Sequence, residues 1–374
     1  MPPSKRITTS PLPESVSPAS AAGLSDETAA ALQSIADEAR SANTTRSYKS
    51  AISYIGTWHS LRYGSPLELP VPDHTVLTFL TDHVASAVVV GHRSQHRTTM
   101  PAAVLRSLIQ SGARIGVADL SSATISQRLA ALSKSHTLLS IKLGRPVPNP
   151  FRDPQVKAAL ANARRANAKR DLTTKKKQPL DAEALAKLLA TCDDSLRGLR
   201  DRALLCFAFA SGGRRRSEVT AADMKHLKKT SGGNYVYDLL LSKTNQSGEH
   251  RDDRHKPVKG MAARALTAWL SAAHIRTGRI FRSIGPTGKV SDSLSDSAVF
   301  EMVKQRAEKA GFNREDFSPH SIRAGFVTES VRRNVPMVEA MEMTGHVTTR
   351  QFAAYYRPRK NSESDAAHLL ESDK

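Results

Sequence analysis

The stretch TGHVTTRQFAAYYRP, residues Thr344–Pro358, places two adjacent tyrosines a few positions after a Gly-His pair. Tyrosine is scarce in this chain, which contains 7 in total. A tyrosine in a helix usually packs against its neighbours, whereas a phenol beside His and Arg side chains can act as a nucleophile. The remainder of the sequence has to decide between a packing role and a catalytic role.

Three segments upstream also carry residues with candidate chemistry. In SGGRRRSEV, residues Ser211–Val219, two glycines interrupt an apolar helix and three arginines follow, a combination that suits close approach to a phosphate. In HSIRAG, His320 and Arg323 are three residues apart and share one helical face. In SKTNQSG, Lys243 follows an apolar run, where its long amine could reach a leaving oxygen. Taken singly, each segment favours an ordinary interpretation, namely a solvated helix start, a surface pair and a turn lysine.

Taken together, in the order Arg, Lys, His-x-x-Arg, Gly-His and Tyr, the segments resemble the tyrosine recombinases, also called phage-type integrases. The first arginine box of that family, Gly-x-Arg-x-Ser-Glu, falls on GRRRSE. Its nucleophile usually lies nine residues beyond the last histidine, a spacing that Tyr355 meets and Tyr356 does not. The resemblance therefore implies Glu218 as a supporting partner of the first arginine and a catalytic set of Arg215, Lys243, His320, Arg323, His346 and Tyr355.

The chemistry of phosphodiester cleavage gives each of these residue types a role. Two arginines would neutralise the non-bridging oxygens, because both stay charged at any relevant pH. A tyrosine with a pKa near 10 becomes a nucleophile only when cations stabilise its phenolate. His320 would take or share the phenol proton, and Lys243 would donate one to the departing 5′ oxygen. His346 would hydrogen-bond the phosphate or the region of the nucleophile, and the product would be a 3′-phosphotyrosyl bond.

No cofactor is implied by the sequence. It contains no carboxylate cluster and no phosphate-binding loop, so neither a metal ion nor a nucleotide is expected. The spacing of His250 and His255 relative to Cys192 and Cys206 matches no familiar zinc site. Both cysteines lie in apolar helical context, which indicates reduced thiols in a core rather than a disulfide framework.

The charge balance favours a polyanionic partner. The chain has 374 residues, enough for two domains, and carries 55 Lys and Arg against 35 Asp and Glu, a net charge of +20. Double-stranded DNA is the partner that the family resemblance implies, although the charge alone would also fit a ribosome-associated or membrane-surface protein. The N-terminus shows no secretion signal and the apolar run VASAVVV is too short to span a bilayer, so a cytoplasmic, nucleoid-associated protein is expected.

The patterning predicts a mainly α-helical fold of the tyrosine recombinase type. A disordered arm is expected over residues 1–24, rich in Pro, Ser and Thr, followed by a helical core-binding domain over residues 25–160. That domain is predicted to contain helices over residues 43–64, 73–90, 99–112 and 121–144, the last capped by Thr124. A basic linker is expected over residues 161–178, and a catalytic domain over residues 179–374, which is mixed α/β but mostly helical.

Within the catalytic domain, Asp181 is expected near a helix cap and residues 235–258 are expected to form a strand and hairpin. Helices are predicted over residues 260–274, 295–311, 318–334 and 337–346. The charge run of the linker fits both a solvated segment and one that lies along a phosphate backbone. Its candidate DNA-binding residues are Arg164, Arg165, Lys169, Arg170, Lys175, Lys176 and Lys177.

Three function classes remain open from the sequence. A site-specific recombinase that integrates, excises or resolves DNA is the first, and a type IB topoisomerase with the same tyrosine chemistry is the second. A catalytically silent DNA-binding relative is the third, and the complete set of residues argues against it. A recombinase would act as a homotetramer assembled on DNA with accessory proteins that set direction. The apolar residues 366–370 of the tail fit docking onto a neighbouring subunit as well as a frayed end.

Overall fold

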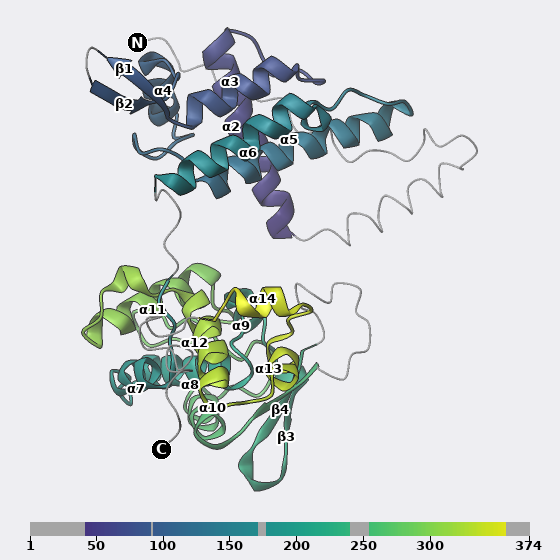
Figure 1. Ribbon diagram of the computed structural model, residues 1–374. Coiled ribbons are helices and arrows are strands. Elements are labelled where there is room, and N and C mark those ends of the chain that lie inside the picture. The colour runs from purple at the N-terminus through teal and green to yellow at the C-terminus, as the bar shows by residue number, and fades with distance from the viewer. Residues whose placement is uncertain (1–41, 91–92, 171–176, 240–253, 357–374) are drawn as a thin grey trace, which may run out of the picture. The chain divides into compact units, whose positions relative to one another are not determined.

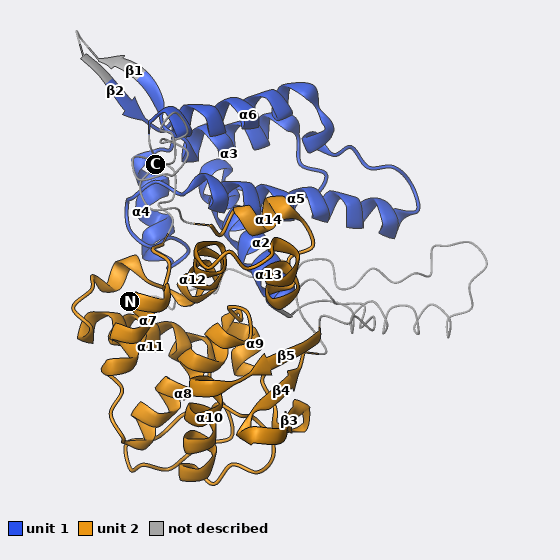
Figure 2. Cartoon of the chain, turned by 60° about the horizontal axis from the view of Figure 1, so that its bottom comes forward, with its two compact units in different colours: residues 1–175 blue, residues 176–374 orange. Residues whose placement is uncertain are grey.

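The computed structural model describes residues 42–90, 93–170, 177–239 and 254–356. The chain divides into two compact units, residues 1–175 and 176–374 (Figures 1 and 2). The expected N-terminal arm and the C-terminal tail lie outside the described residues. The described part is mainly α-helical with two small antiparallel sheets, which confirms the predicted fold class.

Unit 1 packs its helices around one apolar core. From α2, Ile55 and Trp58 are fully buried, and they meet Phe79, Leu108 and Leu132 from three other helices. The helical spacing of apolar residues over positions 48–58 therefore marks the face of α2 that turns inward. The helices of this unit in the described residues are α2 (Ala42–Tyr63), α3 (Asp73–His83), α4 (Ala102–Gln110), α5 (Ser122–Leu143) and α6 (Pro154–Lys169).

The helix predicted over residues 73–90 is wrong in its second half. Helix α3 ends at His83, and the chain then forms a hairpin of β1 (Ser86–Val90) and β2 (Arg93–Arg97). Three consecutive valines end β1, and β-branched residues favour extended backbone over helix. The return of the hairpin is fixed to α3 because Thr99 donates its backbone N–H to the carbonyl of Thr81 at 3.1 Å.

Helix α5 is capped one turn before the predicted residue. Ser121, not Thr124, is the N-cap, and its side chain accepts the backbone N–H of Thr124 at 3.1 Å. The helix ends at Gly144, which adopts the left-handed conformation with φ 62°. Thr124 was predicted to cap the helix as the acceptor. Instead, its backbone N–H donates to the cap residue Ser121.

Helix α6 continues through the predicted start of the linker at residue 161. Asp153 caps its N-terminus by accepting the backbone N–H groups of Gln155 and Val156. The helix then runs to Lys169, with Val156 and Asn167 buried against the unit. Alanine and arginine are strong helix formers, so this basic segment forms a helix despite its charge. Residues 171–176 of the expected linker lie outside the described residues.

Unit 2 combines helices with a three-stranded sheet that lies at its edge (Figures 1 and 2). The strands β3 (Leu227–Lys229), β4 (Tyr235–Asp238) and β5 (His255–Val258) pair antiparallel in that order, which confirms the predicted strand and hairpin. Asp181 caps α7 as predicted, by accepting the backbone N–H of Ala184 at 3.0 Å. The helices are α7 (Ala182–Ala190), α8 (Leu196–Ala210), α9 (Arg216–Thr220), α10 (Gly260–Ala272), α11 (Asp296–Lys309), α12 (Pro319–Arg332), α13 (Met337–Thr344) and α14 (Thr349–Ala353).

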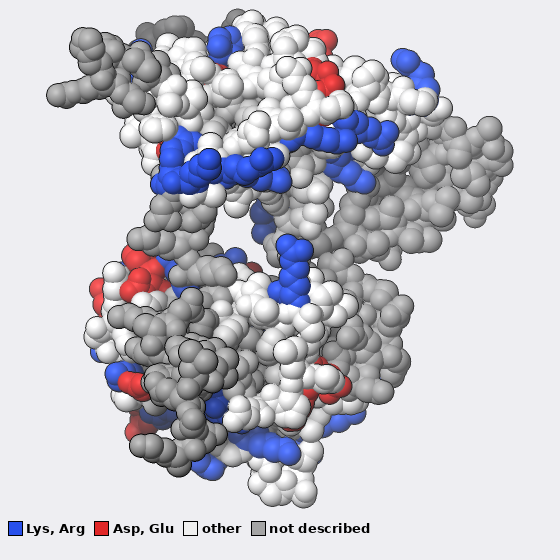
Figure 3. All heavy atoms as spheres, in the orientation of Figure 1, with Lys and Arg blue, Asp and Glu red and all other residues white. Residues whose placement is uncertain are grey.

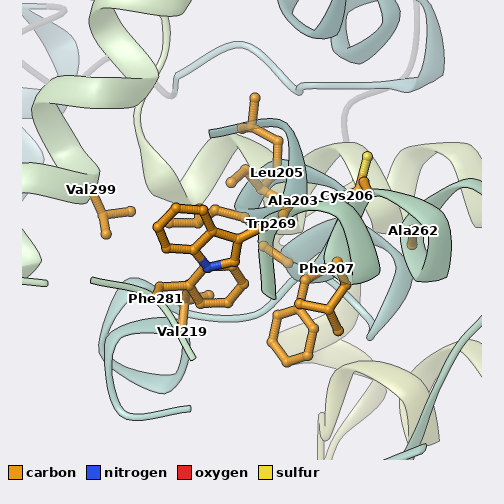
Figure 4. Packing of buried hydrophobic residues seen from close by; sticks show 14 of the residues in the cluster. Ala203, Leu205, Cys206, Phe207, Val219, Ala262, Trp269, Phe281 and Val299 are labelled. Atoms are coloured by element: carbon orange, nitrogen blue, oxygen red, sulfur yellow. The ribbon is translucent and has the colours of Figure 1, made fainter. Parts of the chain in front are cut away.

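The main core of unit 2 forms around α8 and Trp269. Residues Ala203–Ala208 of α8 are all buried, as expected for a helix that is covered on every side. Trp269 of α10 is fully buried and donates its indole N–H to the carbonyl of Ile280 at 2.8 Å. The rings of Phe207 and Phe281 pack beside it, with their centroids 5.5 Å apart (Figure 4). Cys192 and Cys206 are buried free thiols of this core.

A second, smaller cluster of buried residues joins the last three helices of unit 2. Val327 of α12, Ala340 of α13 and Phe352 of α14 form its centre. Tyr355 and Tyr356 are partly buried against these residues. This satellite cluster therefore fixes the segment that carries both candidate tyrosines onto α12.

Candidate active site

The double glycine after α8 allows the chain to pass close to α12 and α13. Gly212 and Gly213 have φ of 99° and 67°, a region that side chains disfavour. A Cβ at Gly212 would lie 2.0 Å from the carbonyl oxygen of Met343, and one at Gly213 would lie 2.6 Å from the Cα of Arg323. Only glycine fits at either position. The sequence predicted that these glycines allow close approach to a phosphate, but in the structure they allow close approach of neighbouring backbone segments of the protein.

Glu218 holds Arg215 at the start of α9. The Arg215 backbone N–H donates to Oε2 of Glu218 at 3.0 Å, and the Arg215 Nη1 donates to Oε1 at 2.6 Å. Burial would raise the pKa of Glu218, but the charges of Arg214 and Arg215 outweigh it and hold the pKa below its ordinary value. An ionised Glu218 therefore fixes the guanidinium of Arg215, whose side chain remains 19% exposed.

The three successive arginines lie in three different environments. Arg214 is 2% exposed, donates Nη2 to the carbonyl of Met343 and forms an ion pair with Glu218. Arg216 is 45% exposed and pairs at 3.4 Å with Asp296 of α11. Arg215 lies between these extremes, because it is anchored at one nitrogen and partly accessible to a ligand.

Arg323 of α12 is the most buried cation of the site. It is 1% exposed and donates Nη1 to the carbonyl of Gly213 at 3.2 Å and Nη2 to the carbonyl of Thr344 at 2.6 Å. Burial, followed by the charges of Arg215 and Arg214, lowers the pKa of Arg323 to about 10. Arg323 therefore remains charged at neutral pH, while Arg214 and Arg215 both pair with the one carboxylate of Glu218, so positive charge exceeds negative charge among these four residues. Such an excess of positive charge favours an anionic ligand.

His346 lies against Arg323 just after the end of α13. Gly345, with φ 70°, ends that helix in the left-handed conformation and turns the chain so that the buried His346 ring faces α12. The Nε2 of His346 is 3.3 Å from Nε of Arg323. Burial and then the charge of Arg323 lower the pKa of His346 to about 3, so the imidazole is neutral at physiological pH.

Tyr355 is the tyrosine whose ring lies beside both of these residues. The centroids of the His346 and Tyr355 rings are 5.0 Å apart, and the guanidinium carbon of Arg323 is 5.4 Å from the Tyr355 ring centroid. The adjacent Tyr356 is partly buried against the satellite cluster. The structure thus groups Arg215, Glu218, Arg323, His346 and Tyr355, five of the residues that the sequence selected.

The other two predicted catalytic residues are His320 and Lys243. His320 is the second residue of α12, three positions before Arg323, and its side chain is exposed. Lys243 lies outside the described residues, in the segment between β4 and β5. The roles of both residues therefore remain predictions.

Three cations meet the C-terminal end of α13, and the sequence predicted only one of them. The successive carbonyls of Glu342, Met343 and Thr344 accept hydrogen bonds from Lys256, Arg214 and Arg323 respectively, the first at 2.6 Å. The last carbonyls of a helix lack partners within it and carry the negative end of its dipole, so cations stabilise them. These donors fix the end of α13 and, with it, the position of His346.

Lys256 could have been found from strand periodicity. It is only 2% exposed, although lysine is rarely buried. In β5 the burial pattern of HKPV alternates, so Lys256 shares the inward face with Val258. The signal is a charged residue at a strand position whose side chain points inward. A search for family motifs alone does not detect it. Arg214 gave no comparable signal, because the motif treats it as a neighbour of Arg215.

The basic residues expected in the linker belong to both units. Arg164, Arg165 and Lys169 are carried by α6, where Lys and Arg side chains form a band over the region of α5 and α6 (Figure 3). Arg170 is half-buried and donates to Oδ1 of Asn167 at 2.6 Å. Lys177 belongs to unit 2 and donates to the carbonyl of Glu315. Lys175 and Lys176 lie outside the described residues.

Neither a metal cluster nor a membrane-spanning helix occurs in the described part of the chain. Within residues 42–90, 93–170, 177–239 and 254–356, no group of three or more His, Cys, Asp or Glu side chains could hold a metal ion. Across the same ranges, no helix has the length and apolar character needed to cross a membrane.

Comparison with known proteins gave consistent matches. A sequence model of the phage integrase family matches residues 178–362. An integrase/recombinase XerD homolog of Selenomonas ruminantium is 32% identical over 243 residues, which cover 63% of this chain and 69% of that protein. The tyrosine recombinase XerC of Xanthomonas campestris pv. campestris (strain B100) is 28% identical over 284 residues, which cover 75% of this chain and 77% of that protein.

Structural alignment also matched the chain to solved structures. A lambda integrase dimer bound to a COC′ core site aligns with a TM-score of 0.48 and 14% identity, over 86% of this chain and 90% of that one. The XerH site-specific recombinase bound to a palindromic difH substrate aligns with a TM-score of 0.47 and 17% identity, over 72% and 70%. The family match spans every candidate active-site residue from Arg215 to Tyr355.

Proposed function

The chain belongs to the phage integrase family and is a tyrosine-type site-specific recombinase, and we propose that it cuts and rejoins double-stranded DNA through a 3′-phosphotyrosyl bond at Tyr355. The observation that carries this proposal is the grouping of Tyr355 with Arg323 and His346 at ring distances of 5.4 and 5.0 Å. A phenol beside a buried cation is the arrangement that a tyrosine nucleophile requires.

Arg215 and Arg323 would bind the scissile phosphate. Glu218 fixes the first guanidinium and the carbonyls of Gly213 and Thr344 fix the second, so neither has to reorganise when the charge of the transition state develops. The low pKa of Arg323, about 10, supports this role, because it reflects repulsion from Arg215 and Arg214 as well as burial. A bound phosphate would relieve that repulsion.

Proton transfer accompanies each step of the proposed reaction. The O–H bond of Tyr355 breaks as its oxygen attacks phosphorus, and His320 takes or shares the proton. The bond from phosphorus to the 5′ oxygen then breaks, and Lys243 supplies the proton that this oxygen acquires. A 5′-hydroxyl of a second DNA strand reverses both steps and releases Tyr355. His346, neutral at physiological pH, would accept a hydrogen bond from Arg323 without adding a charge.

The DNA complex is proposed to contain four copies of the chain. Exchange of two duplexes cleaves four strands, so four tyrosines must lie in one assembly on DNA. The basic residues Arg164, Arg165 and Lys169 of α6 are proposed to contact the phosphate backbone. Association with the nucleoid would follow from this affinity for DNA, and accessory proteins would set the direction of exchange.

Substitution of each tyrosine separately tests the proposed nucleophile. The full-length protein first selects its binding site from random-sequence duplexes, and nicked suicide duplexes carrying that site then trap covalent adducts. We expect Tyr355→Phe to abolish the adduct and Tyr356→Phe to retain it, because Tyr355 alone combines the nine-residue spacing with contact to Arg323. The opposite outcome, an adduct lost only in Tyr356→Phe, would reverse the assignment. Supercoiled plasmids with paired and single sites separate recombination from simple relaxation.

A further inference from the structure

The buried ring of His346 lies between a hydroxyl and a guanidinium. Its Nδ1 is 2.8 Å from Oγ1 of Thr344, and its Nε2 is 3.3 and 3.2 Å from Nε and Nη2 of Arg323. Thr344 is only 1% exposed, and its Oγ1 is also 2.9 Å from the carbonyl oxygen of Ala340. One polar chain therefore runs from Ala340 through Thr344 and His346 to Arg323.

The donor and acceptor at every link follow from a single constraint. A guanidinium has five N–H donors and no acceptor, so the Nε2 of His346 has to be the acceptor toward Arg323. A neutral imidazole carries one proton, which then lies on Nδ1 and is donated to Oγ1 of Thr344. The hydroxyl proton of Thr344 is in turn donated to the preceding turn of α13, where the carbonyls of Ala340 and Met341 lie 2.9 and 3.1 Å from Oγ1. Each of the three polar groups thus has a defined proton.

We propose that Thr344 is a positioning residue, which holds His346 as the Nδ1–H tautomer so that Nε2 fixes the Arg323 guanidinium before DNA binds. Thr344 suits this task because its hydroxyl can accept from His346 while donating to the preceding turn of α13, whereas an aliphatic side chain of the same shape can do neither. The catalytic consequence rests on the proposed function of Arg323, but the tautomer itself does not.

The tautomer can be observed directly in the full-length, DNA-free protein. Two-bond ¹H–¹⁵N correlation spectra of ¹⁵N-histidine-labelled protein distinguish the two ring nitrogens, and His346→Asn identifies the signal among the 13 histidines. We expect a protonated Nδ1 and an unprotonated Nε2 in the wild type. Thr344→Val should give a mixture of both tautomers, and Thr344→Ser should restore the wild-type pattern because it keeps the hydroxyl.

The same variants connect the tautomer to cleavage. Thr344→Val should slow adduct formation on the suicide duplex about tenfold, the effect of losing one hydrogen bond, with half-site affinity unchanged. Thr344→Ser should cleave at close to the wild-type rate. A Thr344→Val protein that cleaves slowly but keeps the wild-type spectrum would show a merely structural effect and overturn the proposal.

If the valine variant does not fold, the wild-type spectrum alone still tests the proposed tautomer of His346. A proton on Nε2 of His346 in the wild type overturns the proposal, and Thr344→Ala provides a smaller second variant for the tautomer measurement. If the expected tautomers are seen but the wild type forms no adduct on any selected duplex, the proposed function fails while the role of Thr344 stands.

Discussion

At the scale of single residues, the environments of three adjacent arginines separate their roles. Family spacing predicted Arg215 as the phosphate ligand, and it is the arginine that is anchored by Glu218 and still partly exposed. Spacing could not reveal that Arg214 is buried against the carbonyl of Met343, because that contact joins segments 129 residues apart. Arg214→Ala is therefore expected to lower stability, which makes it a poor test of the register, whereas the exposed Arg216 offers a matched substitution.

Arg215→Ala should slow cleavage by two to three orders of magnitude. Loss of one preorganised donor at a charged transition state typically costs about 3–4 kcal/mol. Arg216→Ala should cleave within about twofold of the wild type, because a surface ion pair such as that with Asp296 contributes little. Single-turnover cleavage of the suicide duplex measures both rates, and a gel-shift titration verifies binding. Normal cleavage by Arg215→Ala together with inactive Arg216→Ala would show that the arginine register is wrong.

At the scale of secondary-structure elements, the structure depends on contacts that local patterns do not contain. The sequence predicted α10, α11, α12 and α13 to within two residues at each end, and α10 buries Leu266, Trp269 and Leu270 along one face as an amphipathic helix does. Sequence periodicity failed after His83, where alanines and a hydrophobic run look helical although the hairpin is fixed by Thr99 of the following segment. It also could not predict that donors from β5, the loop after α8 and α12 meet at the end of α13. Such a convergence is a property of the tertiary fold.

Lys256→Met should weaken the end of α13 without changing the surface of the protein. The substitution removes a buried, charge-assisted hydrogen bond to Glu342, whose contribution is about 1.5–3 kcal/mol. We expect a lower free energy of unfolding by urea and slower cleavage, since His346 follows the same helix end. The exposed Lys259 provides the matched control, and Lys259→Met should resemble the wild type. Equal stability and equal cleavage in both variants would exclude a role for Lys256 at this helix end.

At the scale of the whole molecule, each unit contains one of the 2 tryptophans as a buried reporter of its own core. Trp58 of unit 1 donates its indole N–H to Asp82 at 3.1 Å, and Trp269 of unit 2 donates to Ile280. The two indole N–H signals therefore follow the unfolding of the two units separately. The chain length predicted two domains. It gave no information on the polar side chains that are buried in unit 1, such as Asp82 and His83.

Unit 1 should lose stability in mild acid through His83. The Nε2 of this ring is 2.7 Å from the hydroxyl oxygen of Tyr54, and burial, with smaller effects from Arg114 and Arg128, lowers its pKa to about 4 from an unfolded value of 6.5. Between these values the unfolded chain binds more protons than the folded one, so stability is full above pH 6.5 and falls toward pH 4. The loss at about pH 4.5 relative to about pH 7 is roughly 2–3 kcal/mol.

Urea titrations at about pH 7 and about pH 4.5, read from the Trp58 indole signal, measure this loss. His83→Gln keeps an acceptor for Tyr54 but does not titrate, so the difference between the two pH values should shrink in unit 1. The Trp269 signal of unit 2 should respond to pH equally in both proteins, which makes it the internal control. An unchanged pH dependence of Trp58 in His83→Gln would remove His83 as its cause.

The glycines of the protein also differ in how freely they can change during evolution. At Gly56 of α2, a β-carbon would have nothing within 4 Å, so alanine there is sterically acceptable and lowers the entropy of the unfolded chain. A β-carbon at Gly212 would lie 2.0 Å from Met343, and one at Gly325 of α12 would lie 1.8 Å from the carbonyl oxygen of Leu180. Neither position can accept a substitution unless a neighbouring backbone segment shifts in the same lineage. Sequence change around the proposed catalytic arginines is thus limited first by the close approach of backbone segments, whatever the chemistry requires.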